Sequence, residues 1–269
     1  MKKLILILAT ALLTVILSAC GNNQKGADSD DTLKAVDKDK VKVVTSFSMI
    51  EDMVKEIGGK HVEVTNLVPT GTDPHDYEPR PSDIKHLSQA DLVFYNGLNL
   101  EGGEQGWLSK ALSSTDFSKK NAIKASEGIS PKYIKDEDGN KEVNPHAFID
   151  PNVGEKMIKN ITKSLSERNP KYKSYYEANE KEYLKKLNNI EDDYNQQLGS
   201  IPKEDRVFVA SEQAFQYLTD RYDLKEGYIW PIDTDENGTP NQIKDLTKFI
   251  KSNKPATLFV ESNVDTRPM

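Results

Sequence analysis

The chain contains a single cysteine, Cys20, among its 269 residues, so no disulfide can form within it. A fold of this size must therefore rest on its hydrophobic core, and the length suffices for one large domain or for two of ordinary size. The helical motif HExxH is also absent, which removes one sequence signature of zinc-dependent hydrolases.

Basic residues are in the minority: the chain has 36 Lys and Arg and 43 Asp and Glu, which gives a net charge of −7 at pH 7. Residues 1–19 contain two lysines and no acid, so without them the net charge is −9. An acidic chain is a poor candidate for binding nucleic acid or an anionic lipid surface. We therefore expect no nucleic-acid partner, and any membrane attachment must come from acyl chains rather than from charge.

The one long apolar run lies near the N-terminus, from Leu4 to Leu17, after a basic start. This layout is typical of a secretory signal, and the run is too short for a comfortable membrane span. The segment Leu17 to Cys20 resembles the lipobox of bacterial lipoproteins, in which the cysteine becomes the lipid-modified first residue. We predict a signal peptide over residues 1–19, lipid attachment at Cys20 and a location on the outer face of the bacterial cell membrane. The alternative is a plain signal peptide with an unrelated cysteine.

Residues 20–40 are polar and charged, with few aromatic or β-branched side chains, which predicts a disordered tether. Beyond them, apolar runs typical of buried strands alternate with stretches of helical periodicity, which indicates an α/β fold with mainly parallel sheets flanked by helices. The predicted strands are 42–47, 61–68, 91–96, 206–210 and 256–260, and the predicted helices are 49–57, 82–89 with Ser82 as cap, 152–167, 214–222 and 243–250.

The longest periodic stretch begins at Pro170 and continues to about Leu198, with apolar and aromatic residues every three or four positions. At about 1.5 Å per residue, such a helix crosses a small domain. We predict two α/β lobes, residues 41–169 and 200–269, joined by a rigid linking helix over residues 170–199. An ordinary surface helix is the alternative interpretation.

Only the nine residues Glu261 to Met269 follow the last predicted strand. A domain that stops just after an internal strand is unusual. We therefore expect the C-terminal lobe to be incomplete, and the chain to be a C-terminally truncated copy or a fragment of a longer protein.

The loop Gly71 to Pro81 (GTDPHDYEPRP) holds one histidine, His75, among three prolines and three acidic residues. Each proline fixes its own φ and restricts the residue before it, so His75 lies on a stiff segment of chain. A rigidly held imidazole beside carboxylates suggests a metal ligand. A solvated turn is the simpler interpretation of one isolated histidine, so other residues must decide.

Two further residues occupy comparable positions. His146 also follows a proline at the start of a structured segment, and Glu212 comes directly after the predicted strand 206–210. Taken singly, His146 could be a loop histidine and Glu212 an acid that stabilises a helix N-terminus. Ligands of open α/β sheets bind beyond the carboxyl ends of strands, so these two residues and His75 can converge if the lobes face each other.

Four blocks resemble those of a known family: the TxPHxxEP-like Thr72 to Pro79, NPHAFIDP from Asn144 to Pro151, ASEQAF from Ala210 to Phe215, and FVESNVDTRPM from Phe259 to Met269. The chain resembles the metal-binding solute-binding lipoproteins of ABC importers, the cluster A-I family that serves manganese and zinc uptake. The resemblance extends from the lipobox to Met269. It implies a metal-type periplasmic-binding-protein fold, no enzymatic activity, and delivery of the ion to an ABC permease with its cytoplasmic ATPase.

The resemblance also implies the metal ligands. In that family the matching histidines and glutamate bind the ion, which assigns His75, His146 and Glu212. The fourth ligand of the family is an aspartate that falls beyond Met269, and Asp265 does not occupy its position.

The expected ion is Mn²⁺, because two imidazoles with carboxylates form a mixed nitrogen and oxygen site that suits it better than a three-histidine site does. Zinc-type relatives usually carry a third histidine where Glu212 stands and a histidine-rich loop. Residues 132–144, by contrast, contain no histidine. Zn²⁺ is the alternative ion.

The remaining histidines, His61 and His86, are expected to be structural or solvated. We expect a monomer. A surface adhesin remains compatible with a lipid anchor and an acidic chain. A metallohydrolase is the other alternative, since two histidines and one carboxylate with an open fourth position also describe catalytic zinc sites, but the sequence shows no separate general base.

Overall fold

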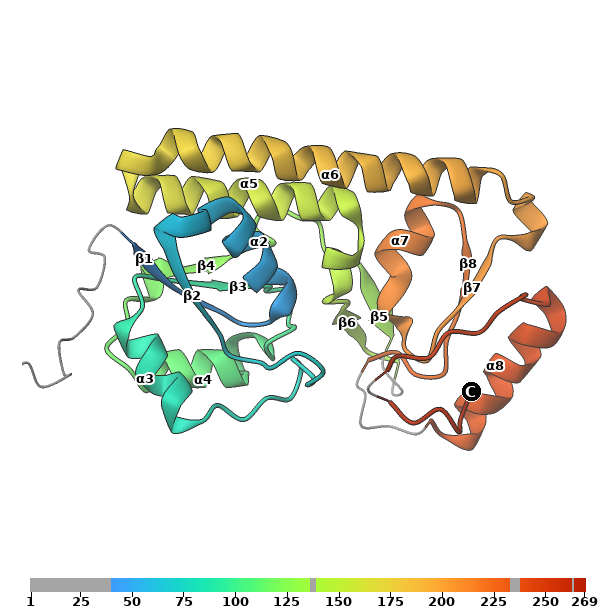
Figure 1. Ribbon diagram of the computed structural model, residues 1–269. Helices are drawn as coiled ribbons and strands as arrows, with labels where there is room; N and C mark the ends of the chain where they lie inside the picture. Colours follow the sequence, from blue (N-terminus) through green and yellow to red (C-terminus); the bar gives the residue numbers. More distant parts are fainter. Residues whose placement is uncertain (1–39, 136–138, 233–237, 263) are drawn as a thin grey trace, which may run out of the picture. The chain divides into compact units, whose positions relative to one another are not determined.

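The computed structural model describes residues 40–135, 139–232, 238–262 and 264–269 (Figure 1). The predicted signal peptide, the lipid attachment at Cys20 and nearly all of the predicted tether lie outside these residues. Within them, no helix is long and apolar enough to cross a membrane.

The first sheet is parallel and has the strand order β2-β1-β3-β4, as the sequence predicts for an α/β fold. Its strands are β1 (Val41–Thr45), β2 (Val62–Asn66), β3 (Leu92–Tyr95) and β4 (Ala122–Lys124), and the connecting helices are α2 (Ser48–Gly58), α3 (Pro81–Gln89) and α4 (Trp107–Ser113). Parallel strands need such crossover connections. The predicted cap of the second helix is wrong, because α3 starts at Pro81 with Arg80 as its cap residue, and Ser82 lies inside it.

The charged stretch 132–144, in which the sequence indicates a turn but no strands, contributes an antiparallel pair of strands, β5 (Tyr133–Lys135) and β6 (Lys141–Val143). Asn144, Pro145 and His146 follow directly after β6. The 3₁₀ turn His146–Ile149 follows, and then α5 (Pro151–Arg168) begins. The side chain of Asp150 caps α5 by accepting a hydrogen bond from the main-chain N–H of Asn152.

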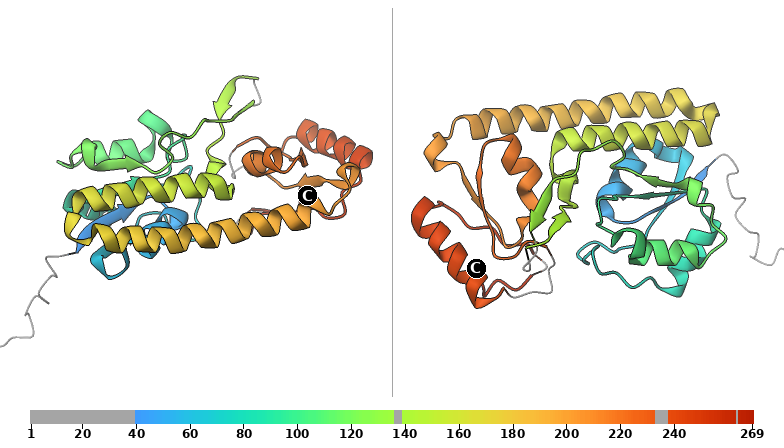
Figure 2. Two further views of the ribbon diagram at one scale, coloured as in Figure 1. Left: turned by 90° about the horizontal axis from the view of Figure 1, so that it is seen from above. Right: turned by 180° about the vertical axis from the view of Figure 1, so that it is seen from behind.

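The long predicted helix exists as α6 (Lys173–Gly199), which starts after a 3₁₀ turn at Pro170–Tyr172. It lies beside α5 in every view and extends past it toward β7 and β8 (Figures 1 and 2). Its first half is fastened to α2: the Tyr183 hydroxyl donates to Asp52 Oδ2 at 2.6 Å, and Asn179 donates to the carbonyl of Ile57 at 2.9 Å.

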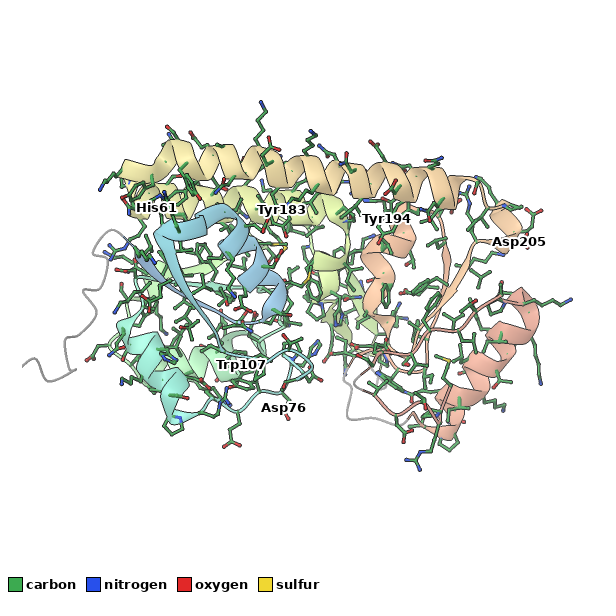
Figure 3. All side chains as sticks on the ribbon, viewed as in Figure 1. His61, Asp76, Trp107, Tyr183, Tyr194 and Asp205 are labelled. Atoms are coloured by element: carbon green, nitrogen blue, oxygen red, sulfur yellow. The ribbon has the colours of Figure 1, made fainter. Side chains whose placement is uncertain are left out.

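The second half of α6 meets the C-terminal part of the chain, where the rings of Tyr194 and Tyr222 pack edge to face with centroids 5.6 Å apart. Tyr183 and Tyr194 mark these two contacts along the helix (Figure 3). The helix therefore contacts both parts of the fold, as a linking helix must.

The C-terminal part contains a parallel pair, β7 (Val207–Val209) and β8 (Lys225–Gly227), with α7 (Gln216–Arg221) and α8 (Pro240–Asn253). The predicted strand at 256–260 is wrong. A main-chain hydrogen bond joins Phe259 to Val209, but the alternating bonds of a ladder do not follow it.

The described residues form two separate hydrophobic cores. The first surrounds the four-stranded sheet, α2 and α5, and the second is built on Val209, Ile229, Trp230 and Leu246. We call the part with the four-stranded sheet, α2 and α5 the N-terminal lobe, and the part with β7, β8, α7 and α8 the C-terminal lobe. The predicted α/β fold of two lobes with a long connecting helix is confirmed.

Candidate metal site

The three predicted ligands lie at the ends of different elements. His75 belongs to the loop between β2 and α3, His146 opens the turn before α5, and Glu212 follows β7. Glu212 forms an isolated parallel bridge with Trp230, and the main-chain N–H of Gln213 donates to the Trp230 carbonyl at 3.0 Å. Because Trp230 is buried in the second core, these contacts anchor Glu212 on the C-terminal lobe.

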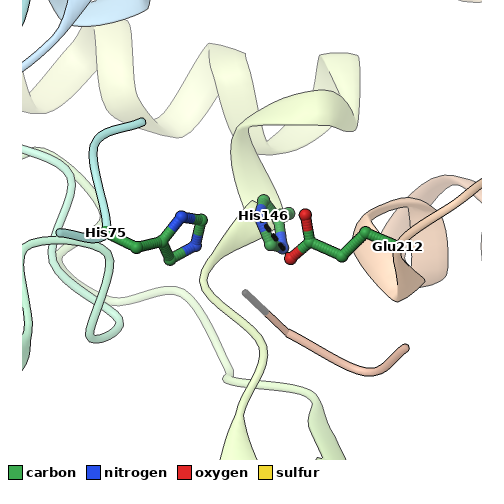
Figure 4. A group of neighbouring side chains, drawn as sticks. All are labelled: His75, His146 and Glu212. Carbon is green, nitrogen blue, oxygen red and sulfur yellow. Dashed lines mark ion pairs between the residues drawn. The ribbon is translucent and has the colours of Figure 1, made fainter. Parts of the chain in front are cut away.

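The structure brings the three side chains together (Figure 4). One potential ligand atom from each of His75, His146 and Glu212 lies within 4.8 Å of the others. His146 Nε2 and Glu212 Oε1 are 3.5 Å apart, and the rings of His75 and His146 have centroids 5.1 Å apart. His146 and Glu212 are only 5% and 4% exposed, so the group lies largely out of solvent.

His75 is oriented by the residue two positions before it. Asp73 Oδ1 accepts a hydrogen bond from the main-chain N–H of His75 at 2.8 Å and lies 2.7 Å from its Nδ1. The carboxylate therefore holds the proton on Nδ1 and leaves Nε2 for a ligand. Trp107 also holds this turn, because its indole N–H donates to the carbonyl of Pro74 at 2.9 Å.

His146 is oriented in the same way by Asn144. Asn144 Oδ1 accepts from the main-chain N–H of His146 at 3.1 Å and lies 2.9 Å from its Nδ1. The sequence analysis missed Asp73 and Asn144. The repeated pattern of Asp or Asn, then proline, then histidine at 73–75 and 144–146 was the signal that could have found them.

The electrostatics of the site favour the neutral form of His146. Burial, with a smaller contribution from His75, lowers the pKa of His146 to about 3, and Asp73 opposes this shift. His146 is therefore neutral at pH 7, which is the form that binds metal. A neutral ring nitrogen that faces the Glu212 carboxylate at 3.5 Å is an arrangement that a cation between them stabilises.

Two nitrogen donors and one carboxylate suit divalent transition metals, including manganese and zinc. The other histidines lie elsewhere. His61 stacks on the ring of Tyr172 with centroids 3.6 Å apart, and His86 lies on α3. Asp265 pairs with Arg267 and is not part of the group of three.

Comparison with known proteins identifies the family. Residues 43–269 match the ZnuA family, described as zinc-uptake complex component A, periplasmic. The chain belongs to this family of metal-binding proteins, whose matched region contains all three residues of the site.

Similar proteins include named transport components. The chain is 40% identical over 270 residues to the manganese ABC transporter substrate-binding lipoprotein PsaA of Streptococcus mitis, with 100% of this chain and 85% of that protein covered. It is also 40% identical to the metal ABC transporter substrate-binding lipoprotein SloC of Streptococcus mutans, with the same coverage. These relatives are substrate-binding components of ABC transporters rather than enzymes.

Solved structures agree with the fold. A Mn-bound periplasmic metal binding protein from Candidatus Liberibacter asiaticus has a TM-score of 0.75 and 31% identity, over 85% of this chain and 82% of that one. A Cd-bound structure of the periplasmic metal binding protein from the same organism also has a TM-score of 0.75, with 32% identity and the same coverage.

Proposed function

We propose that the chain is the extracytoplasmic metal-binding component of an ABC importer, and that it captures Mn²⁺ and delivers it to a permease driven by a cytoplasmic ATPase. The observation that carries this proposal is the convergence of two imidazoles and one carboxylate from two lobes on one largely buried point. The membership in the metal-binding family and the manganese transport components among its relatives support it.

His75, His146 and Glu212 are the proposed ligands of the ion. Residues 1–19 act as the signal peptide, and residues 20–40 form a tether that is anchored through lipid on Cys20 to the outer face of the cell membrane. The protein works as a monomer that carries its cargo and does no chemistry on it. A mixed nitrogen and oxygen donor set accommodates Mn²⁺, whereas Zn²⁺ exceeds Mn²⁺ in affinity for most such sites.

The experiment is metal binding by calorimetry with residues 21–269, freed of metal, and Mn²⁺ or Zn²⁺ as titrant. We expect one ion per chain. Replacing His75 with alanine should lower the affinity by at least the roughly 10- to 100-fold that is typical even of residues behind the ligands. His86→Ala is the matched control, because His86 lies on α3 outside the group.

If wild-type protein and His75→Ala bind Mn²⁺ alike, or if His86→Ala loses as much affinity as His75→Ala, the assignment of the site fails. Binding of Zn²⁺ without any detectable binding of Mn²⁺ would instead identify a zinc carrier. Metal-dependent hydrolysis of ester or peptide substrates would contradict the transport role.

A further inference from the structure

Asn144 lies fully buried between two of the proposed ligands. Its Oδ1 contacts His146 as described above, and its Nδ2 donates to the main-chain carbonyl of Gln213 at 2.9 Å and to Gln216 Oε1 at 3.3 Å. Gln213 is the residue directly after Glu212. One amide group therefore touches the histidine of the N-terminal lobe and the turn that carries the carboxylate of the C-terminal lobe.

The orientation of this amide is fixed by main-chain partners. The N–H of His146 can only donate and the carbonyl of Gln213 can only accept, so the oxygen of Asn144 must face the first and its nitrogen the second. Because Oδ1 has no proton to give, Nδ1 of His146 must donate to it. The lone pair of the neutral ring is then on Nε2, which is the nitrogen that faces Glu212.

The main chain of Asn144 is held as firmly as its side chain. Its N–H donates to the carbonyl of Lys132 at 2.9 Å, and its carbonyl accepts from the Tyr217 hydroxyl at 2.9 Å. The same hydroxyl accepts from the N–H of Lys132 at 2.7 Å, and Tyr217 lies on α7 of the C-terminal lobe. Asn144 is thus part of a buried hydrogen-bonded connection between the lobes.

We propose that Asn144 is a positioning residue of the metal site: its oxygen sets the ring state of His146, and its nitrogen sets the place of Glu212. Comparison with Asp73 explains why an amide stands here. Asp73 gives His75 the same acceptor through a carboxylate, but a carboxylate at position 144 could not donate to the Gln213 carbonyl. This inference rests on the proposed function, since it concerns the same ion.

The test uses three variants of residues 21–269. Asn144→Ala removes both contacts, and Asn144→Asp, measured at pH 8, keeps the acceptor but loses the donor. Asn160→Asp is the matched control, because the Asn160 amide also donates to two main-chain carbonyls, those of Ala125 and Glu127, but lies on α5 away from the site. The readouts are Mn²⁺ affinity, melting temperature and the ¹⁵N shifts of the His146 ring in metal-free protein.

We expect both Asn144 variants to lose about 10- to 100-fold in Mn²⁺ affinity, as for other residues that orient metal ligands, and Asn160→Asp to bind like the wild type. The His146 ring should keep its proton on Nδ1 in Asn144→Asp and become a mixture of tautomers in Asn144→Ala. A merely structural role would lower the melting temperature without changing this ring signal.

Mn²⁺ affinity of Asn144→Asp within about threefold of the wild type overturns the inference, and so does an unchanged ring state in Asn144→Ala. If Asn144→Ala does not fold, the Mn²⁺ affinity and the His146 ring signal of Asn144→Asp decide whether the inference holds. If wild-type protein binds no metal, the proposed function fails by itself, whereas the ring state of the Asn144 variants still tests whether Asn144 orients His146.

Discussion

His146 Nε2 and Glu212 Oε1 lie 3.5 Å apart, although one residue belongs to the N-terminal lobe and the other to the C-terminal lobe. Neither residue is more than 5% exposed. Since the ring is neutral at pH 7, this contact between the lobes is not an ion pair there. The arrangement is that of two proposed ligands facing a shared position, and its consequences can be measured.

Acid should destabilise the metal-free protein through His146. Its pKa is lowered from 6.5 to about 3 by burial and His75, so below pH 6.5 the unfolded chain takes up a proton that the folded chain does not. The free energy of unfolding then falls as the pH decreases from 6.5 toward 3, by about 2 to 3 kcal/mol at pH 4.5 from this residue. Urea unfolding at pH 4.5 and pH 7 measures it. Between pH 7 and pH 4.5 the free energy of unfolding of His146→Gln should fall by about 2 to 3 kcal/mol less than that of the wild type. Equal decreases in the two proteins would contradict the prediction.

Glu226 should give the opposite pH dependence. Burial is the main cause that raises its pKa from 4.5 to about 7. Between these values the folded chain holds a proton that the unfolded chain has released, so stability decreases as the pH rises through this window, by up to about 3 kcal/mol. Glu226→Gln should therefore be more stable than the wild type at pH 8 and similar at pH 4.5. Thermal melts at both pH values test this, with the exposed Glu63→Gln as control.

Arg221 should stabilise the junction of α7 with α5. Its Nε donates to Asp150 Oδ1 at 2.8 Å, and Asp150 is only 5% exposed and caps α5. Arg221→Met leaves this buried carboxylate without its cation, which should cost about 2 kcal/mol of unfolding free energy. Lys203→Met removes only the exposed pair with Asp223 and should cost less than about 0.5 kcal/mol. Similar losses for the two variants in urea unfolding would be evidence against the role of Arg221.

Glu212 should decide the preference between ions. Replacing it with histidine creates a site with three imidazoles, which favours Zn²⁺ over Mn²⁺. We expect the ratio of Zn²⁺ to Mn²⁺ affinity to rise by roughly tenfold or more, on the general ranking of ligand types. Competition titrations with both ions measure the ratio. Glu212→Gln is the control, since it adds no imidazole, and an unchanged ratio in Glu212→His would rule out this role.

Much of the fold was predictable because local patterns and packing agree. The buried run of β1 and the helical spacing of α2 and α5 follow directly from the positions of apolar residues, all of which enter one core. The segment 256–260 has the same kind of apolar run, but strand formation depends on pairing partners that a local pattern does not contain. For the same reason the antiparallel pair of β5 and β6, with one buried residue in β5, was not predicted.

The three residues of the site were predictable from motifs, whereas the contacts that orient them were not. Asp73 and Asn144 act on histidines two positions away, but the bond from Asn144 to Gln213 joins segments that only the fold brings together. Likewise, the depressed pKa of His146 depends on burial of the ring in the folded chain, which no spacing along the chain encodes.

The two turns at 73–75 and 144–146 have a kinetic consequence. Each holds its imidazole by hydrogen bonds at both Nδ1 and the main-chain N–H, so the rings have already lost most of their rotational freedom before an ion arrives. These side chains therefore lose little additional conformational entropy when an ion binds. The rate of capture should therefore depend on how fast the ion sheds its water shell, rather than on side-chain rearrangement.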